Sequence, residues 1–330
     1  MKISIIIPTL GRKKALSQCL NALNQQLVLP FEVIVVLNNK NNPQIIQEKY
    51  SFPISWIDAQ KQKGQSRAKN IGAQNARGDL LAFIDDDCKV KNDFIEKIKS
   101  FYKSQENWQK IILVGNIIFT HHYPKSFSPK QYKQNILKDR ILNLPLLILE
   151  SFFKKSAGGT IFPWGRCVIQ YNTKIPQYGQ NAKPIACDWG GAGNLMIPRK
   201  LFLHSSGFDN HLMHGCHFEE PELCLRLKNL GAQIYFSAKV IVDHPEISTQ
   251  AQNFYHLRAN EMYFGLKNCA FHSPISFVLF CIYHIWQTFI YILLSFWKIE
   301  YFKRIQGKIK GVRHFLIINF FGKARQGNKK

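Results

Sequence analysis

The stretch LLAFIDDDCKV, residues 80–90, runs an apolar segment directly into three consecutive aspartates. The apolar part predicts a buried β-strand. Three adjacent carboxylates repel one another, so they are not a choice that stabilises a fold. Carboxylates grouped at the end of a strand suit a divalent cation, because Mg²⁺ prefers oxygen ligands and shares them with phosphates. The alternative is a solvated turn whose aspartates cap the following helix.

The segments around this strand alternate between strand and helix patterns. Strands are predicted at 3–7, 31–39, 53–59, 79–85 and 111–119, and helices at 12–26, 64–78 and 91–109. This alternation indicates βαβ units, hence an α/β fold with a mostly parallel central sheet and flanking helices. Ligands of such sheets bind beyond the carboxyl ends of the strands. Pro8 and Thr9, Asn38 and Asn39, and the aspartates all follow strands, so we expect them to line one crevice.

Composition describes a globular, strongly basic chain. Of its residues 46% are hydrophobic, and 44 Lys and Arg stand against 21 Asp and Glu, a formal net charge of +23. This excess favours a polyanionic partner such as nucleic acid, an acidic membrane or a phosphorylated substrate. The eight cysteines form no CxxC pair and are read as reduced thiols. The first apolar run is too short for a signal peptide, so we expect the bulk of the chain on the cytoplasmic side.

The C-terminal region changes character. No Lys, Arg, Asp or Glu lies between Lys267 and Lys298, and residues 298–330 then hold ten Lys and Arg against one Glu. Three interpretations are open: a transmembrane helix, an in-plane or re-entrant helical pair, or the core helix of a soluble oligomer. A spanning helix would export the basic tail against the positive-inside tendency. The in-plane arrangement is favoured because it keeps five cations on anionic headgroups: Lys303, Arg304, Lys308, Lys310 and Arg313.

Several motifs together resemble a known family. They are SIIIPTLGR (4–12), GQSRAKNIGAQNARGDLLAFIDDDC (64–88), GAGNLMIPRK (191–200), GFD (207–209), EEPELCLRLKNLG (219–231) and DHP (243–245). Their order and spacing resemble the inverting family 2 nucleotide-sugar glycosyltransferases of the GT-A fold. The resemblance implies a Rossmann-like nucleotide-sugar-binding half at 1–119 and an acceptor-binding half at 120–245. We expect residues 246–330 to form a helical, membrane-associating region.

The resemblance assigns a metal site to the aspartates, which are the DXD motif of this family. Asp85 then faces the nucleotide and the metal, and Asp87 binds the Mg²⁺ or Mn²⁺ that bridges the diphosphate. Asp86 either points away or contacts the donor. His244 resembles a histidine that is a further metal ligand in some of these enzymes; the alternative for His244 is a plain turn residue.

The resemblance also implies a donor site. Pro8 and Thr9 would pack against the base, and Asn38 and Asn39 would meet its edge, with Leu37 at the family's usual aspartate position. Arg67, Lys69 and Asn70 would lie beside the diphosphate or ribose, with Lys69 in place of the usual arginine. The alternative for these residues is a plain turn or a solvated helix charge.

An inverting transfer needs a base for the acceptor hydroxyl. The family uses the second acid of a Glu-Asp pair that opens a helix, which makes Glu220 the candidate here. The alternative is an acidic helix start favoured by the helix dipole. Acceptor or sugar contacts are expected from Asp188, Trp189, Gly191, Asn194 and Glu219, although Trp189 is also consistent with a core residue.

The expected function is therefore metal-dependent, inverting sugar transfer on the cytoplasmic face of a bacterial membrane. A UDP-sugar is the favoured donor, with GDP- and dTDP-sugars as alternatives, and a glycan or polyprenyl-linked molecule is the acceptor. A nucleotidyltransferase would need a glycine-rich basic loop after the first strand, where only Gly11 occurs. A nucleic-acid-binding protein fits the charge but has no matching motif. HLMHGCHFEE (211–220) has no second zinc-ligand pair and is read as a loop over the active site.

Overall fold

A computed structural model describes residues 1–38, 49–59, 64–119, 141–152, 158–169, 183–212, 218–244 and 254–321. Its main sheet has nine strands in the order β3-β2-β1-β4-β10-β6-β11-β5, with β9 also paired to β11. The strands are β1 (Ile3–Thr9), β2 (Glu32–Leu37), β3 (Ile54–Asp58), β4 (Leu80–Phe83), β5 (Lys89–Val90), β6 (Ile111–Phe119), β9 (Ile185–Ala186), β10 (Leu195–Pro198) and β11 (Gln233–His244), and a separate hairpin joins β7 (Gly159–Ile161) to β8 (Cys167–Ile169). The helices are α1 (Lys13–Asn24), α2 (Gln65–Asn75), α3 (Phe94–Lys103), α5 (Leu147–Phe152), α6 (Arg199–His204), α7 (Glu219–Asn229), α8 (Phe254–Gly265), α9 (Pro274–Ser295) and α10 (Ile299–Leu316).

The sheet is mixed rather than mostly parallel. Its parallel pairs are β1 with β2 and β4, β2 with β3, and β6 with β11. β10 runs antiparallel between β4 and β6, and β5 and β9 run antiparallel to β11. β10 departs from the expected parallel arrangement because it enters the sheet in the opposite direction. As a result, the glycine-rich segment before β10 reaches the same edge as the carboxyl end of β4.

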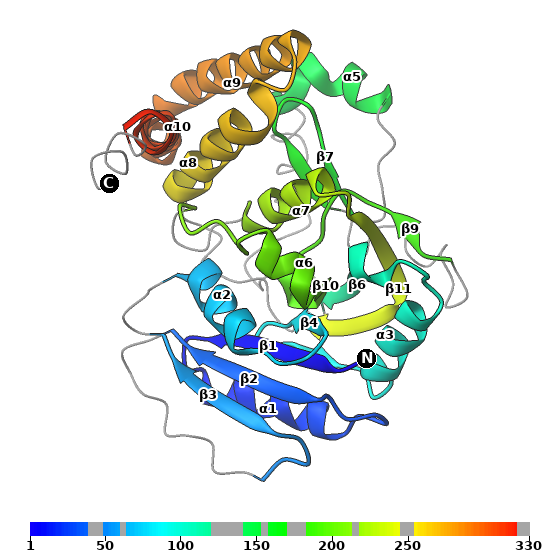
Figure 1. Ribbon diagram of the computed structural model, residues 1–330. Helices are drawn as coiled ribbons and strands as arrows, with labels where there is room; N and C mark the ends of the chain where they lie inside the picture. Colours follow the sequence, from blue (N-terminus) through cyan, green and yellow to red (C-terminus); the bar gives the residue numbers. More distant parts are fainter. Residues whose placement is uncertain are drawn as a thin grey trace, which may run out of the picture.

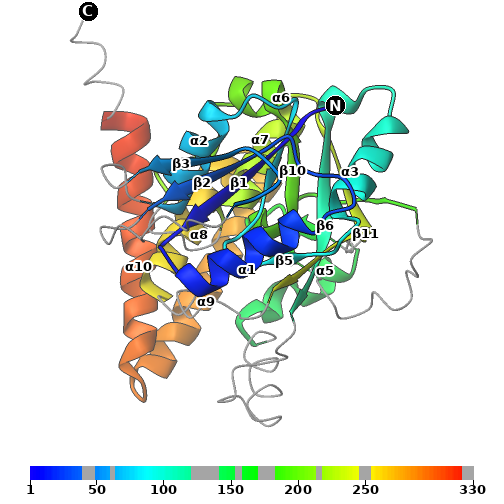
Figure 2. The same ribbon diagram turned by 90° about the horizontal axis from the view of Figure 1, so that it is seen from below.

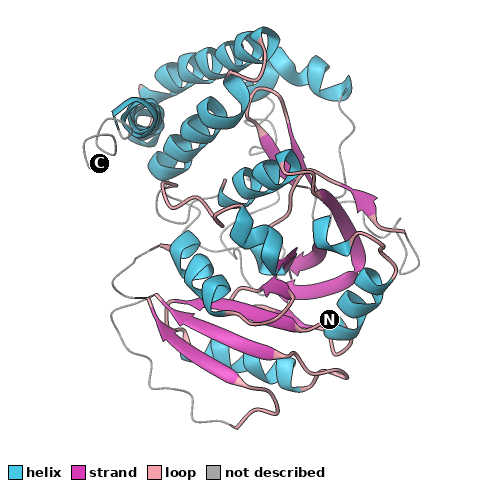
Figure 3. Cartoon of the chain, in the orientation of Figure 1, coloured by secondary structure: helices cyan, strands magenta, loops and turns pink. Residues whose placement is uncertain are grey.

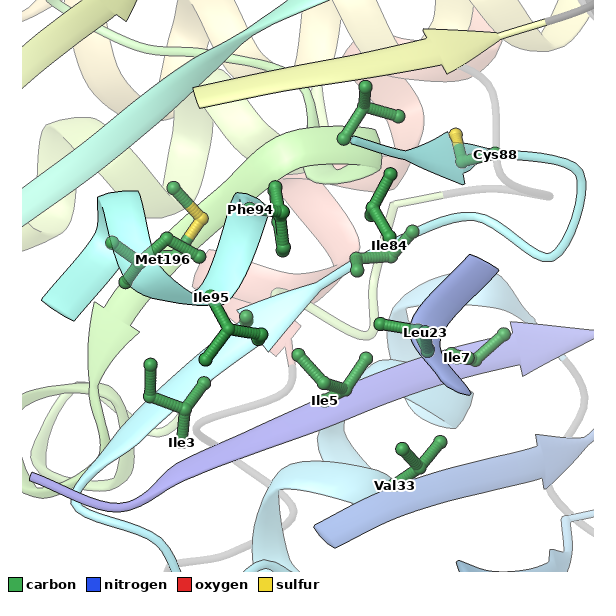
Figure 4. Close-up of a cluster of buried hydrophobic side chains, with 14 of the residues drawn as sticks. Ile3, Ile5, Ile7, Leu23, Val33, Ile84, Cys88, Phe94, Ile95 and Met196 are labelled. Atoms are coloured by element: carbon green, nitrogen blue, oxygen red, sulfur yellow. The ribbon is translucent and has the colours of Figure 1, made fainter. Parts of the chain in front are cut away.

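Helices cover both faces of the sheet (Figures 1 and 2). α1 and α3 pack on one face, where Leu20 and Phe94 join a buried cluster that includes Ile5. Figure 4 shows part of this cluster, with Cys88 among its side chains. α2, α6 and α7 pack on the other face through a second buried cluster. Because both faces are covered, β1, β2 and β4 are buried at every position rather than at alternate ones.

A bulge interrupts β11. Ser237 pairs with Gly115 of β6, but the next pair joins Ile241 to Asn116, so three residues of β11 have no partner in this register. The side-chain amide of Asn194 fills the irregularity and donates to the carbonyls of Asn116 and Val240, each at 3.0 Å. A Cβ on Gly115 would lie 2.1 Å from that amide, so Asn194 fits only because residue 115 is glycine.

The C-terminal part of the described chain is helical (Figure 3). α8 continues into a π-helical turn at Leu266–Ala270, and α9 and α10 follow. α10 packs closely on α8, because a Cβ on Gly311 would lie 2.4 Å from the carbonyl oxygen of Ala259. By length and composition, α9 could cross a membrane. The predicted division at residues 119 and 245 stays a prediction.

Candidate active site

Two acids and a histidine meet at the carboxyl edge of the sheet. Asp85 and Asp87 follow β4, and His244 ends β11. Nε2 of His244 lies 3.4 Å from Oδ1 of Asp87 and 3.8 Å from Oδ2 of Asp85. Oδ1 of Asp87 and Nδ1 of His244 are buried without a hydrogen-bond partner among the described residues. Two carboxylates and an imidazole with unused lone pairs form a donor set that fits Mg²⁺ or Mn²⁺.

Cys88 lies beside Asp85 and His244 but is not a suitable metal ligand. Its sulfur and ligand atoms of Asp85 and His244 all lie within 4.8 Å of one another. However, the side chain is fully buried in the apolar cluster beneath the sheet edge. Burial raises the pKa of the Cys88 thiol well above its ordinary value, so the thiolate form that metals prefer is disfavoured.

Asp86 points away from its two neighbours. Its carboxylate accepts a hydrogen bond of 2.5 Å from Oγ1 of Thr9 and a second from the guanidinium of Arg12. The same guanidinium lies 2.8 Å from Asp87. Asp86 and Thr9 are therefore hydrogen-bonded to each other, which agrees with the alternative that Asp86 points away from the donor. The predicted contact of Thr9 with the base stays a prediction. Arg12 was missed because its partners are more than seventy residues away and only the turn before α1 brings them together.

Lys69 of α2 is a fully buried cation that faces the acids of α7. Its Nζ lies 3.1 Å from Oε1 of Glu220 and 3.8 Å from Oε1 of Glu219. Burial alone would lower the pKa of Lys69, but the carboxylates of Glu220, Glu219 and Asp85 raise it above the ordinary value. Lys69 is therefore charged and holds the Glu220 side chain in place. The backbone N–H of Ala192 also donates to Glu220, at 3.3 Å.

Glu219 has a different environment from Glu220. It is buried, and its Oε2 has no hydrogen-bond partner among the described residues. Burial, and then the neighbouring charge of Glu220, raise its pKa to about 7. The preceding residue, Phe218, has φ of 84°, a left-handed conformation that is strained for a bulky side chain. Such strain is typical of functional sites, and it lies directly before the two glutamates that begin α7.

Four predicted site residues act as supports in this structure. Asn70 exchanges two hydrogen bonds of 2.8 Å with the backbone of Phe208. Asp188 accepts from the backbone of Ile161 and pairs with Lys228 at 2.6 Å. Trp189 packs over Gly159, where a Cβ would lie 2.2 Å from the indole, and Asn194 is fully buried at the β11 bulge. These contacts support neighbouring segments, while Nε1 of Trp189 and Oδ1 of Asn194 have no hydrogen-bond partner among the described residues. The predicted ligand contacts of the four residues stay predictions.

The remaining predicted site residues differ in burial and in their contacts. Pro8 is buried at the end of β1, and the side chain of Asn38 accepts from the backbone of Gly64 at 3.3 Å. Arg67 is exposed on α2, and Gly191 is half-buried just before the turn that contacts Glu220. Asn39 and residues 213–217 of the histidine-rich loop lie outside the described residues.

Comparison with known proteins agrees with this geometry. Residues 4–151, which include β1 and the three aspartates, match the model of glycosyl transferase family 2. Residues 4–151 therefore resemble this family. The chain is also similar to an uncharacterized glycosyltransferase of Haemophilus influenzae, with 32% identity over 105 residues. This match spans 32% of the chain and 36% of that relative. YfnE of Bacillus subtilis, also named an uncharacterized glycosyltransferase, is 26% identical over 284 residues, or 80% of this chain and 69% of YfnE.

Solved structures confirm the fold. GalNAc-T7 with UDP, GalNAc and Mn²⁺ superposes with a TM-score of 0.58 at 14% identity, over 80% of this chain and 47% of that chain. Residues 1–349 of Staphylococcus aureus TarS superpose with a TM-score of 0.53 at 15% identity, over 99% of this chain and 92% of that one. The expected GT-A fold is therefore correct, with a mixed sheet.

Proposed function

We propose that this protein is an inverting, metal-dependent enzyme that moves a sugar from a UDP-sugar to an acceptor hydroxyl. One observation carries the proposal: the single turn Ala192–Asn194 lies against both the proposed metal ligand Asp85 and the proposed base Glu220. A Cβ on Gly193 would lie 3.0 Å from Oδ2 of Asp85, and the N–H of Ala192 donates to Glu220. A donor lying over this turn would have its diphosphate beside Asp85 and Asp87 and its sugar beside Glu220.

The donor side is assigned to the acids and the imidazole. Asp87, Asp85 and His244 would hold a divalent cation. When bound there, Mg²⁺ or Mn²⁺ supplies positive charge for the nucleoside diphosphate as it leaves. GalNAc-T7 is known with UDP and Mn²⁺, and TarS with UDP-GlcNAc, which supports a UDP-linked donor. Lys69 adds a fixed positive charge close to Asp85.

Glu220 is the proposed base. Its carboxylate is held by Lys69 and Ala192, and its side chain keeps 13% of its surface exposed, against 4% for Glu219. In this role the Glu220 carboxylate takes the proton of the acceptor hydroxyl. The acceptor oxygen attacks the anomeric carbon as the diphosphate oxygen departs on the opposite side, so one displacement inverts that carbon.

The acceptor is proposed to be a glycan or a polyprenyl-linked molecule at the cytoplasmic face of a membrane. Two relatives support this class by their names. One, from Methanococcus voltae, transfers to a dolichyl-phosphate-linked sugar, and TarS transfers N-acetylglucosamine to poly(ribitol phosphate). The apolar helix α9 supports the membrane location.

Donor hydrolysis and transfer test the assignment. The wild-type protein with UDP-GlcNAc and Mn²⁺ should release UDP, and EDTA should stop the release. Asp87→Asn should lose most activity and most Mn²⁺ affinity measured by calorimetry, and Glu220→Gln should lose transfer while it still binds Mn²⁺. Glu106→Gln, an exposed acid beyond α3, is the matched control. Full activity of Glu220→Gln would contradict the assignment of Glu220 as the base. Activity in EDTA would contradict the requirement for a metal ion.

A further inference from the structure

Helix α9 carries an unbroken apolar stripe on its outer side. The stripe recurs at alternating steps of three and four residues, so its members share one helix face. Each exposes between 41% and 80% of its surface, and they are Ile275, Val278, Ile282, Ile285, Phe289, Ile292 and Phe296. A helix on a soluble protein usually turns such a face inward, so this stripe needs a partner.

The inner side of α9 holds the polar residues of the helix, together with Phe280, which packs against Met262 and Ala270. Tyr283 donates to Glu261 of α8 at 2.9 Å, and His284 lies 2.8 Å from Nζ of Lys308 on α10. Glu261 also pairs with Arg258 at 2.6 Å, and Gln287 is buried beside this group. α9 thus shows its polar face to the protein and its apolar face outward, the reverse of an ordinary amphipathic surface helix.

The neighbouring segments extend the apolar surface. Phe302, Ile309, Val312 and Leu316 of α10 are exposed on one face of that helix. At the other end of α9, Ile148 of α5 is 76% exposed, and Trp286 donates to the carbonyl of Ile141 just before α5. Figure 1 shows α9 lengthwise and α10 end-on on the side of the molecule opposite β3, and Figure 2 shows α10 lengthwise. The two long helices therefore lie in one layer.

We infer that the outward faces of α9, α10 and α5 form a surface that docks flat on an anionic lipid bilayer. This inference refines the membrane location in the proposed function. Exposed cations border the apolar faces and suit acidic headgroups, each contributing about 1 kcal/mol near the surface; they are Lys298, Lys303, Lys310 and Arg313. Apolar side chains that face lipid and cations that face headgroups are the pattern of an in-plane helix.

The inner contacts argue against a spanning α9. To cross the bilayer, α9 would have to leave α8 and α10. That movement would strip Tyr283 and His284 of their partners, leave Lys308 without His284, and leave Glu261 with Arg258 alone. Polar side chains in hydrocarbon and unpaired buried charges both cost several kcal/mol. In-plane docking keeps every one of these contacts.

A second copy of the chain fits this apolar surface less well than a bilayer does. Helices that pair in water generally flank an apolar seam with charged residues. Residues 268–297 contain no Lys, Arg, Asp or Glu, so α9 has no such flanks. The surface also includes helices that cross one another, which suits a plane better than a single seam.

The test is co-sedimentation of the full chain with phosphatidylcholine vesicles, with and without phosphatidylglycerol. We expect binding that needs the acidic lipid and weakens with salt. Ile285→Gln combined with Phe289→Gln should weaken binding about tenfold or more, because two buried side chains are lost. Leu27→Gln, 72% exposed and outside the three helices, is the control and should bind as the wild type does. Circular dichroism and donor hydrolysis in solution verify that the variants are folded.

Three results would overturn the inference. Wild-type protein that stays in the supernatant with both lipids would show that the surface does not bind a bilayer. A dimer in lipid-free solution that Ile285→Gln and Phe289→Gln dissociate would assign the surface to a second copy. A C-terminus reached by protease only from the outside of intact cells would establish a spanning helix. None of these results depends on sugar transfer, so the proposed function is tested separately.

Discussion

Nζ of Lys267 lies 2.7 Å from Oε1 of Glu222 and 2.6 Å from Oδ2 of Asp209. Lys267 belongs to the π-helical turn after α8, and Glu222 belongs to α7, one turn beyond Glu219 and Glu220. Glu222 is fully buried and also pairs with Arg226. The C-terminal helices are thereby joined by charge to the helix that carries the proposed base. π-Helical turns are frequent at functional sites, which fits this position.

Replacing Lys267 tests this link. Lys267→Met keeps the length of the side chain but leaves Glu222 with Arg226 as its remaining cation, so we expect a loss of about 1–3 kcal/mol in unfolding free energy. We also expect kcat for transfer to fall more than the affinity for the UDP-sugar, because Lys267 touches neither the metal acids nor Lys69. Urea denaturation and steady-state kinetics provide both values. Lys200→Met, at an exposed site on α6, should change neither; equal behaviour of the two variants would contradict the link.

Arg12 neutralises the aspartates in the absence of metal. Arg12→Met should lower the stability of the metal-free protein by about 1–2 kcal/mol, a modest value because the guanidinium is half exposed. A cation should then restore more stability than it does in the wild type, since the acids have lost their competing partner. Thermal melts with EDTA and with Mn²⁺ measure the difference, and Lys103→Met on α3 is the control. An identical Mn²⁺ response in Arg12→Met and the wild type would refute the competition.

Glu219 should make stability depend on pH. Its pKa is raised from 4.5 to about 7, so the folded state holds the proton more tightly than the unfolded state. Ionisation of Glu219 therefore costs stability progressively as pH rises from about 4.5 through about 7. Glu219→Gln removes this cost and should be more stable than the wild type by about 1–3 kcal/mol at pH 8, with little difference at pH 4.5. Melts at both values measure it; a gain of the same size at both would show that charge is not the cause.

Gly311 sets the distance between α10 and α8. An alanine in a helix is ordinarily more favourable than glycine by about 1 kcal/mol. At Gly311, however, the added carbon would lie 2.4 Å from a backbone carbonyl and 2.7 Å from Cβ of Met262. We expect Gly311→Ala to destabilise by about 1–3 kcal/mol, and Gln306→Ala, exposed on the same helix, to stabilise slightly. Chemical denaturation of both variants decides, and a stabilised Gly311→Ala would show that the helices are further apart.

Most strands and helices could be predicted from local sequence patterns. The runs at β1, β2 and β4 are continuously apolar because both faces of the sheet are covered, and that signal can be read from a short window. The acids after β4 could be recognised as a candidate site because three adjacent carboxylates repel one another and suit a cation. The convergence of Asp85, Asp87 and His244 followed from their places after strands that end at one edge.

The features that were missed depend on contacts distant in sequence. Asp86 resembles its neighbours in sequence, and only the placement of Thr9 and Arg12 after β1 shows that it turns away. Asn194 stands in a segment rich in glycine, which gives no sign of its hydrogen bonds to strands β6 and β11. Its predicted contact with a ligand stays a prediction. α9 was read correctly as apolar, but composition does not show which face its few polar residues occupy.

The bulge in β11 decides which side chain reaches the aspartates. Ile234 and Phe236, before the bulge, belong to the cluster on one face of the sheet, whereas Val240 and Val242 belong to the cluster on the other. Because the number of unpaired residues is odd, even-numbered residues face one side of the sheet before the bulge and the other side after it. A shift of the register by one residue has the same effect. His244 follows the parity of Val242 and arrives beside Asp87. If the same sequence had two unpaired residues here instead of three, Asp243 would pair with Phe119 in the place of His244. The length of this irregularity therefore determines whether an imidazole or a carboxylate reaches the metal site.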